Sequence, residues 1–92
     1  MTKQQYRDAR KLIEDPAHWC QHTAYCTDEN GVVVARCAMG AVSMIAANDH
    51  VYELRQAATE INGHWAVSAL NDATDHATVL RMFDRAIELA KE

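Results

Sequence analysis

The chain has 92 residues, a formal net charge of −4 and an apolar fraction of 49%. A chain of this length buries only about 60 to 65% of the surface that its unfolded form exposes, so we expect a single compact domain over residues 1–92. The acidic balance, without clusters of Lys and Arg, argues against nucleic acid as a partner. No stretch approaches the about 18 apolar residues of a membrane span, and the N-terminus lacks the apolar region of a secretion signal. These features predict a cytoplasmic protein with no membrane partner.

The first predicted element is an amphipathic helix over about residues 3–14. Apolar residues recur at helical spacing from Tyr6 to Ile13. Thr2 is a suitable N-cap, and the segment EDP at residues 14–16 is typical of a helix end.

Two short strands are predicted next, over residues 23–27 and 32–36. Both stretches are rich in β-branched or aromatic residues, and the segment DENG at 28–31 is typical of a hairpin turn. The sequence therefore predicts one β-hairpin after the first helix.

The register of this hairpin depends on its turn. A two-residue turn at Asn30 and Gly31 places Ala24 opposite Cys37. A three-residue loop with Gly31 in the left-handed region moves Cys37 to the opposite face from Cys26. The sequence leaves both registers open.

Three further helices are predicted over about residues 39–47, 51–61 and 75–91. The first is small and apolar and ends at Asn48-Asp49, the second ends at Asn62-Gly63, and the third carries one clear apolar face. The predicted fold class is α+β: a mostly helical small domain of about four helices, with the hairpin between the first and the second.

Metal binding is the first chemistry to weigh. Cys20, His22, Cys26 and Cys37 include zinc ligand types, but their spacing lacks the paired elements of common structural zinc sites. An odd number of cysteines without a secretion signal indicates reduced thiols rather than a disulfide framework. We therefore expect no metal and no cofactor.

A reactive thiol at Cys37 is a second candidate for chemistry. Cys37 precedes a helix start, and Asn71, Asp72, His64 or His76 would supply a base and a group to orient it. The competing interpretation is structural: the residues around Cys37 are small because the helix packs closely against the hairpin. We prefer the structural interpretation.

The segment NDATD at residues 71–75 raises a similar choice. Asn71 and Asp72 favour turns, and Thr74 or Asp75 is a suitable cap for the last helix. An acidic pair beside a helix start, with His76 nearby, is also a place where a small protein contacts a partner. Capping is the preferred interpretation, and partner binding remains open.

Several short motifs in a fixed order resemble a family of small uncharacterised bacterial and phage proteins. Its pattern is a Trp after the first helix, Cys-Ala-x-Gly-Ala, and Asn-Asp-Ala leading through Thr and His into a helix with Val and Asp-Arg-Ala. The matching positions are Trp19, Cys37, Ala38, Gly40, Ala41, Asn71, Asp72, Ala73, His76, Val79, Asp84, Arg85 and Ala86. The resemblance implies a phage-associated or bacterial accessory role and transfers no catalytic residue.

Taken with the composition, this resemblance leads us to expect a small cytoplasmic interaction module without enzymatic activity, such as a phage protein that modulates a host protein. The candidate binding residues are Trp19, Cys37, Asn71, Asp72 and His76. The alternative is a small-ligand-binding or thiol-dependent protein that uses Cys37 with Asn71, Asp72 and His76. A protein partner is expected, and a homo-oligomer is left open.

Overall fold

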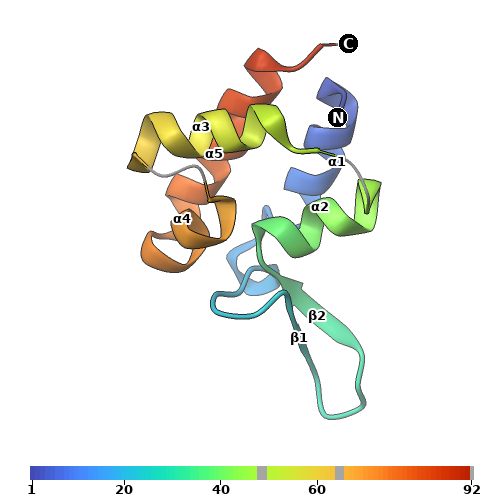
Figure 1. Ribbon diagram of the computed structural model, residues 1–92. Helices are drawn as coiled ribbons and strands as arrows, with labels where there is room; N and C mark the ends of the chain where they lie inside the picture. The colour runs from blue at the N-terminus through green and yellow to red at the C-terminus, as the bar shows by residue number, and fades with distance from the viewer. Residues whose placement is uncertain (48–49, 64–65, 92) are drawn as a thin grey trace.

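The computed structural model describes residues 1–47, 50–63 and 66–91. Within them the chain forms five α-helices, one 3-10 helix and one β-hairpin (Figure 1): α1 (Lys3–Leu12), η1 (Pro16–His18), β1 (Tyr25–Thr27), β2 (Val33–Arg36), α2 (Ala38–Ala46), α3 (Tyr52–Asn62), α4 (Val67–Ala73) and α5 (His76–Leu89). The α+β class and the hairpin between the first two helices are confirmed. The expected number of about four helices is wrong, because a separate short helix, α4, precedes the last one.

Helix α4 forms because its buried residues fall on one helical face. Val67, Leu70 and Asn71 are buried at positions i, i+3 and i+4. Thr74 ends the helix with extended backbone, and its hydroxyl donates to the Leu70 carbonyl at 2.6 Å. Asn71 and Asp72 therefore lie inside a helix, and the turn expected at these two residues is wrong.

The start of α5 follows at once. Asp75 has extended backbone, and its carboxylate accepts a hydrogen bond from the Thr78 N–H at 2.8 Å. This is the geometry of an N-cap, so capping of the last helix by Asp75 is confirmed, whereas Thr74 belongs to the end of α4.

Two other helix ends also follow the predictions. Thr2 and Gln5 form a capping box at the start of α1, with the Thr2 hydroxyl accepting from the Gln5 N–H at 3.1 Å. Gly63 ends α3 in the left-handed region, with φ 76°, and its N–H donates to the Thr59 carbonyl at 2.8 Å. The end predicted at Asn48-Asp49 lies outside the described residues.

The hairpin combines features of both predicted registers. Gly31 has φ 81°, and the tip follows the three-residue loop. A β-bulge between Cys26 and Thr27 then takes up one residue. At the base, the Cys37 N–H donates to the Ala24 carbonyl at 3.1 Å, the pairing that the two-residue turn predicts.

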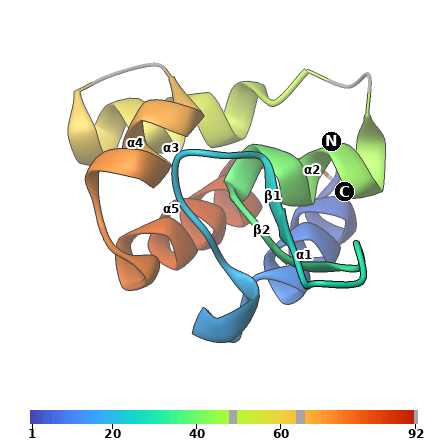
Figure 2. The same cartoon turned by 90° about the horizontal axis from the view of Figure 1, so that it is seen from below.

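The helices surround one core, and the hairpin projects from them (Figure 1). Helix α5 contacts both α1 and α3, α1 contacts α2, and α2 contacts α4. Viewed from the side of the hairpin, the loop that precedes β1 passes close to α4 (Figure 2). At the opposite pole the two ends of the chain meet, where the Lys3 N–H donates to the Lys91 carbonyl at 3.3 Å.

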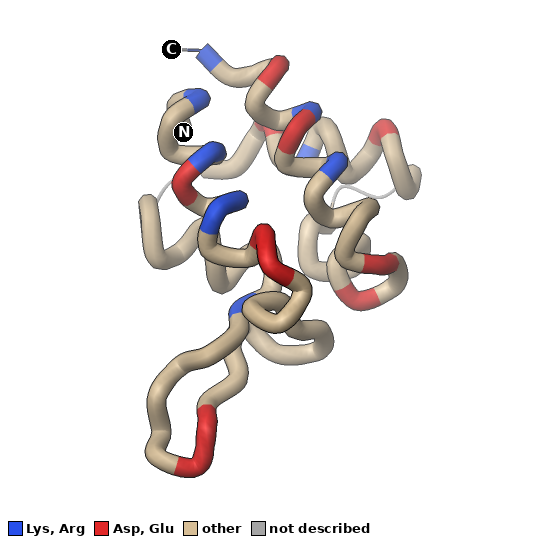
Figure 3. Tube along the Cα trace, turned by 180° about the vertical axis from the view of Figure 1, so that it is seen from behind, with Lys and Arg blue, Asp and Glu red and all other residues tan. Residues whose placement is uncertain are grey.

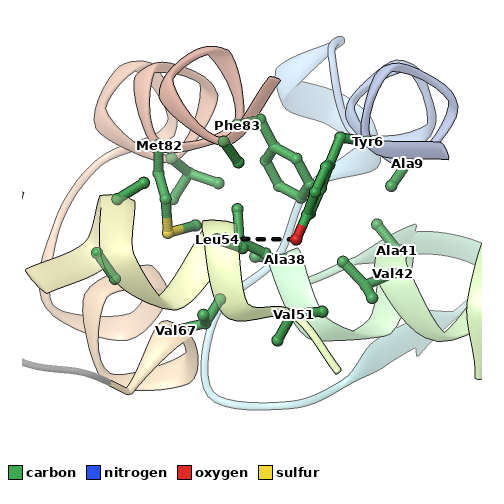
Figure 4. Packing of buried hydrophobic residues seen from close by; sticks show 14 of the residues in the cluster. Tyr6, Ala9, Ala38, Ala41, Val42, Val51, Leu54, Val67, Met82 and Phe83 are labelled. Atoms are coloured by element: carbon green, nitrogen blue, oxygen red, sulfur yellow. Dashed lines mark hydrogen bonds between the residues drawn. The ribbon is translucent and has the colours of Figure 1, made fainter. Parts of the chain in front are cut away.

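The core cluster draws residues from all five helices (Figure 4). Its largest member, Tyr6, is fully buried, and its hydroxyl donates to Glu53 at 2.9 Å and accepts from the Leu54 N–H at 3.4 Å. The other fully or almost fully buried members are Ala9, Ile13, Ala38, Ala41, Val42, Val51, Leu54, Ala57, Ala58, Val67, Leu70, Val79, Met82, Phe83, Ala86 and Ala90. No residue of β1 or β2 belongs to the cluster.

Helix α2 meets the base of the hairpin at Gly40. A Cβ atom built on Gly40 would lie 2.1 Å from the carbonyl oxygen of Ala24, far inside van der Waals contact. The absence of a side chain therefore allows the helix to approach the hairpin backbone. This confirms, at Gly40, that the small residues after Cys37 reflect close packing.

Candidate functional site

The five candidate binding residues come from four segments of the chain and meet around Asn71. Trp19 follows η1, Cys37 precedes α2, Asn71 and Asp72 lie in α4, and His76 begins α5. Cys37 and Asn71 are buried, and the other three are half-buried. The sequence therefore singled out residues that the fold brings together, although their binding role stays a prediction.

Asn71 is the centre of this group, and its side chain is fully buried. Its Oδ1 accepts hydrogen bonds from the indole Nε1 of Trp19 at 2.8 Å and from the N–H of Ala38 at 3.0 Å. Its Nδ2 donates to the Cys20 carbonyl at 3.1 Å and to the Asp72 carboxylate at 3.2 Å. The amide thus joins the loop after η1, the start of α2 and α4, and its hydrogen-bonding capacity is used within the protein.

Asp72 holds the loop before β1 against α4. Its Oδ1 accepts a hydrogen bond from the His22 N–H at 2.8 Å, and this bond is the main reason that the pKa of Asp72 lies below its ordinary value. His22 has φ 68°, a left-handed conformation that is costly for a residue with a side chain. The hydrogen bond to Asp72 helps to hold this conformation.

Gln21 is a positioning residue that the sequence analysis missed. Its Nε2 donates to the carbonyl of Asn71 at 3.1 Å and to that of Thr74 at 2.8 Å, close to the end of α4. The Asn71 carbonyl lies in the last turn of α4, where carbonyls have no helical partner, and the Thr74 carbonyl follows the helix end, so the Gln21 amide satisfies both. No local pattern signals this role, because the partners are about fifty residues apart in the chain.

The half-buried rings of His76 and Trp19 pack against each other at the edge of the residues around Asn71. Their rings are tilted at 54° with centroids 5.4 Å apart. The Nε2 of His76 lies 2.7 Å from the carbonyl oxygen of Ile13, and it is the donor because a carbonyl oxygen only accepts. His76 therefore connects the start of α5 to the end of α1.

Cys37 is the N-cap of α2. Its sulfur accepts a hydrogen bond from the Gly40 N–H at 3.3 Å, and its own N–H joins the base of the hairpin. A thiol here takes the place that Ser, Thr, Asp or Asn commonly fills. The residue thus has a structural role in starting the helix.

A small cavity of about 240 Å³ lies beside this group. In it His22, rather than His76, is the imidazole that accompanies Cys37 and Asp72, and its Nδ1 is 3.9 Å from the Asp72 Oδ2. The cavity is lined by His22, Thr23, Ala24, Cys37, Met39, Ser68 and Asp72. The further base candidate His64 lies outside the described residues.

Cys20, Cys26 and Cys37 are free cysteines in the structure, the first two half-buried and the third buried. Burial, together with the neighbouring Cys26 thiol, raises the pKa of Cys20 to about 12, so this thiol stays protonated and a poor nucleophile at neutral pH. Among residues 1–47, 50–63 and 66–91, no group of three His, Cys, Asp or Glu side chains is placed to hold a metal ion.

A second surface, which the sequence analysis did not single out, lies between the hairpin and α2. We call it the hairpin groove: about 400 Å³, lined by Ala24, Tyr25, Val33, Arg36, Met39, Gly40, Ser43 and Met44. Tyr25 and Met44 are large apolar residues that remain 57% and 58% exposed. The sequence shows that both are apolar, but only the fold shows that neither enters the core.

Comparison with known proteins places the chain in one family. A family model described as "Family of unknown function (DUF6197)" matches residues 1–89. No curated protein and no solved structure matches the chain. Among the described residues, no helix combines the length and the apolar character needed to cross a membrane. Because the match covers nearly the whole sequence, the chain belongs to this family of unknown function.

Proposed function

We propose that this protein is a non-enzymatic interaction module that binds a protein partner at the hairpin groove. The observation that carries the proposal is the exposure of Tyr25 and Met44 on two elements that face each other across an apolar depression. Clustered exposed apolar residues mark interaction sites, because leaving them in water has a cost that binding removes.

The chemistry of the hairpin groove suits a protein partner. Tyrosine is enriched among the residues that dominate binding energy at interfaces. Methionine side chains, here Met39 and Met44, adapt their shape to a partner because they are unbranched and flexible. A projecting hairpin also has few constraints from the core, since none of its residues belongs to the core cluster.

The group around Asn71 supports the same assignment indirectly. Its amide and the indole of Trp19 are already hydrogen-bonded to the protein itself. A ligand at Asn71 would have to replace these internal bonds and leave buried groups unpaired. Binding at the exposed hairpin groove requires no such exchange. In keeping with the resemblance to phage and bacterial proteins, the partner we propose is a cytoplasmic protein of a bacterial host.

The test is affinity capture from a bacterial lysate with wild-type protein and two tyrosine variants. Tyr25→Ser is expected to lose the captured protein, because it removes the aromatic ring from the groove. Tyr52→Ser is the matched control: Tyr52 is 56% exposed, close to the 57% of Tyr25, but lies on α3 outside the groove. Equal capture by both variants, with the fold of each verified by circular dichroism, would contradict the proposal.

A second candidate function is binding of a small molecule, or thiol chemistry, at the small cavity. The observation in its favour is that Cys37, His22 and Asp72 line the same space. The capture experiment separates the two candidates when Cys37→Ala is added. If the partner binds at the hairpin groove, the Cys37→Ala variant still captures it. If the partner binds at the small cavity, the variant remains folded but no longer captures it.

A further inference from the structure

A third depression runs beside β2, between that strand and the end of α1. It measures about 480 Å³ and contains two basic side chains, Lys11 and Arg36, beside the exposed apolar Val34. We call it the basic groove, lined by Lys11, Leu12, Ala17, His18, Val33, Val34 and Arg36. It shares Val33 and Arg36 with the hairpin groove but does not include Tyr25 or Met44.

The positive charge of the basic groove is not compensated within the described part of the chain. Among the described residues, neither the Lys11 ammonium nor the Arg36 guanidinium has a carboxylate within ion-pair distance. The acidic residues closest in sequence to Lys11 are otherwise engaged. Asp8 accepts from the Gln4 amide at 2.8 Å, Glu14 pairs with Arg10 at 3.5 Å, and Asp15 accepts from the Ala17 N–H at 2.9 Å. A carboxylate from outside would therefore meet two available cations.

The tip of the hairpin has the complementary chemistry. Figure 3 shows the acidic tip, formed by Asp28 and Glu29, at the end of the hairpin farthest from the helices. Asp28 is held in place by its bonds to the N–H groups of Asn30 and Val32, and Glu29 has no ion-pair partner among the described residues. Val32, which follows the tip, is 58% exposed.

We propose that two copies of this chain associate through their hairpins, with the acidic tip of each lying in the basic groove of the other. Arg36 pairs with Tyr25 at the base of the hairpin, so the basic end of the groove lies about 10 Å from Asp28 at the tip, at about 3.3 Å per strand residue. A two-fold axis across the middle of two antiparallel hairpins therefore brings both tips to both grooves at once. Such an arrangement is isologous and closes as a dimer.

Apolar contact completes this arrangement. Near the two-fold axis, Val32 and Val34 of one copy meet the same residues of the other, which removes exposed valine surface from water. The pairing goes beyond the proposed function and leaves Tyr25 and Met44 outside it. An interface of two short hairpins is smaller than the about 1,600 Å² of a standard stable complex, so the dimer forms in a concentration-dependent way.

The test is sedimentation velocity of wild-type and charge variants over a wide range of protein concentration. Wild-type protein is expected to shift from monomer to dimer as concentration rises, and less so at high salt, which screens exposed charges. Lys11→Glu and Glu29→Lys are each expected to weaken the dimer about tenfold, since each change places like charges together at two symmetric sites. Combining both changes restores opposite charges and should recover the dimer.

Arg7→Glu is the matched control, because it makes the same charge change on α1 without lining the basic groove. It should sediment as wild type does. A wild-type chain that stays monomeric at every concentration overturns the dimer, as does a double variant no better than the singles. If the basic groove instead binds an acidic segment of another protein, the purified wild-type chain stays monomeric at every concentration. Capture through Tyr25 is a separate readout, so either inference can fail alone.

Discussion

The side chain of Asn71 forms hydrogen bonds to polar groups from three other parts of the chain. An asparagine amide has both acceptor and donor groups, and here they serve the Trp19 indole, the Ala38 N–H and the Cys20 carbonyl. Sequence alone identified Asn71 but assigned it to a turn, because asparagine is common in turns. The bonds that explain it join residues 33 to 52 positions apart, and no local pattern reports such distances.

At this residue we expect Asn71→Ala to lower the free energy of unfolding by about 3 kcal/mol, since it leaves the buried Ala38 N–H and the half-buried Trp19 indole N–H unpaired. Asn62→Ala is the comparison, because Asn62 is only half-buried and has no side-chain hydrogen bond among the described residues. That control should change stability by less than about 1 kcal/mol. Urea unfolding measures both, and similar losses for the two variants would show that the amide network contributes little.

At the scale of elements, the helices with local signals were predicted to within a few residues. Thr2 and Gly63 mark helix ends through bonds to residues three or four positions away, which a sequence reader can anticipate. Helix α4 was missed because it has only seven residues and contains Asn71 and Asp72, both poor helix formers. The bulge at Cys26 lets the tip and the base of the hairpin follow different registers, and no local pattern in the sequence predicts it.

The contact between α2 and the hairpin gives an element-scale prediction. Gly40→Ala would ordinarily favour a helix by up to about 1 kcal/mol. Here the added methyl meets the Ala24 carbonyl at 2.1 Å, and we expect a net loss of about 1 to 3 kcal/mol in the free energy of unfolding. Ser43→Ala, at an exposed position of the same helix, should stay within about 0.5 kcal/mol. Thermal unfolding distinguishes them, and a stabilised Gly40→Ala would disprove the close approach.

For the whole molecule, carboxylates fasten distant segments together at the surface. Asp72 fastens the loop before β1 to α4, Glu60 pairs with Arg85 between α3 and α5 at 2.8 Å, and Asp84 pairs with Arg10 between α5 and α1 at 2.8 Å. Exposed pairs of this kind contribute little singly, so their combined effect appears as a dependence of stability on pH.

The direction of this dependence follows from the lowered pKa values. The His22 N–H lowers the pKa of Asp72 from 3.8, and bonds from Thr78 lower that of Asp75 from 3.8. A carboxyl group with a lowered folded-state pKa adds stability above its unfolded pKa and loses it as the pH falls through the folded value. We therefore expect the melting temperature to fall between about pH 5 and about pH 2.

Asp72→Asn keeps an oxygen for the His22 N–H but removes the titrating group, so its melting temperature should fall less steeply with acid. Calorimetry over this pH range measures the slope. Parallel curves for the variant and the wild type would show that Asp72 has no share in the acid response.

The meeting of the two chain ends at Lys3 and Lys91 has a consequence for tethering. Both ends leave the molecule at the pole opposite the hairpin (Figure 1). A fluorescent protein, a surface anchor or a neighbouring domain joined to either end therefore extends away from the hairpin. Immobilised in this way, the protein presents its hairpin outward to the solution.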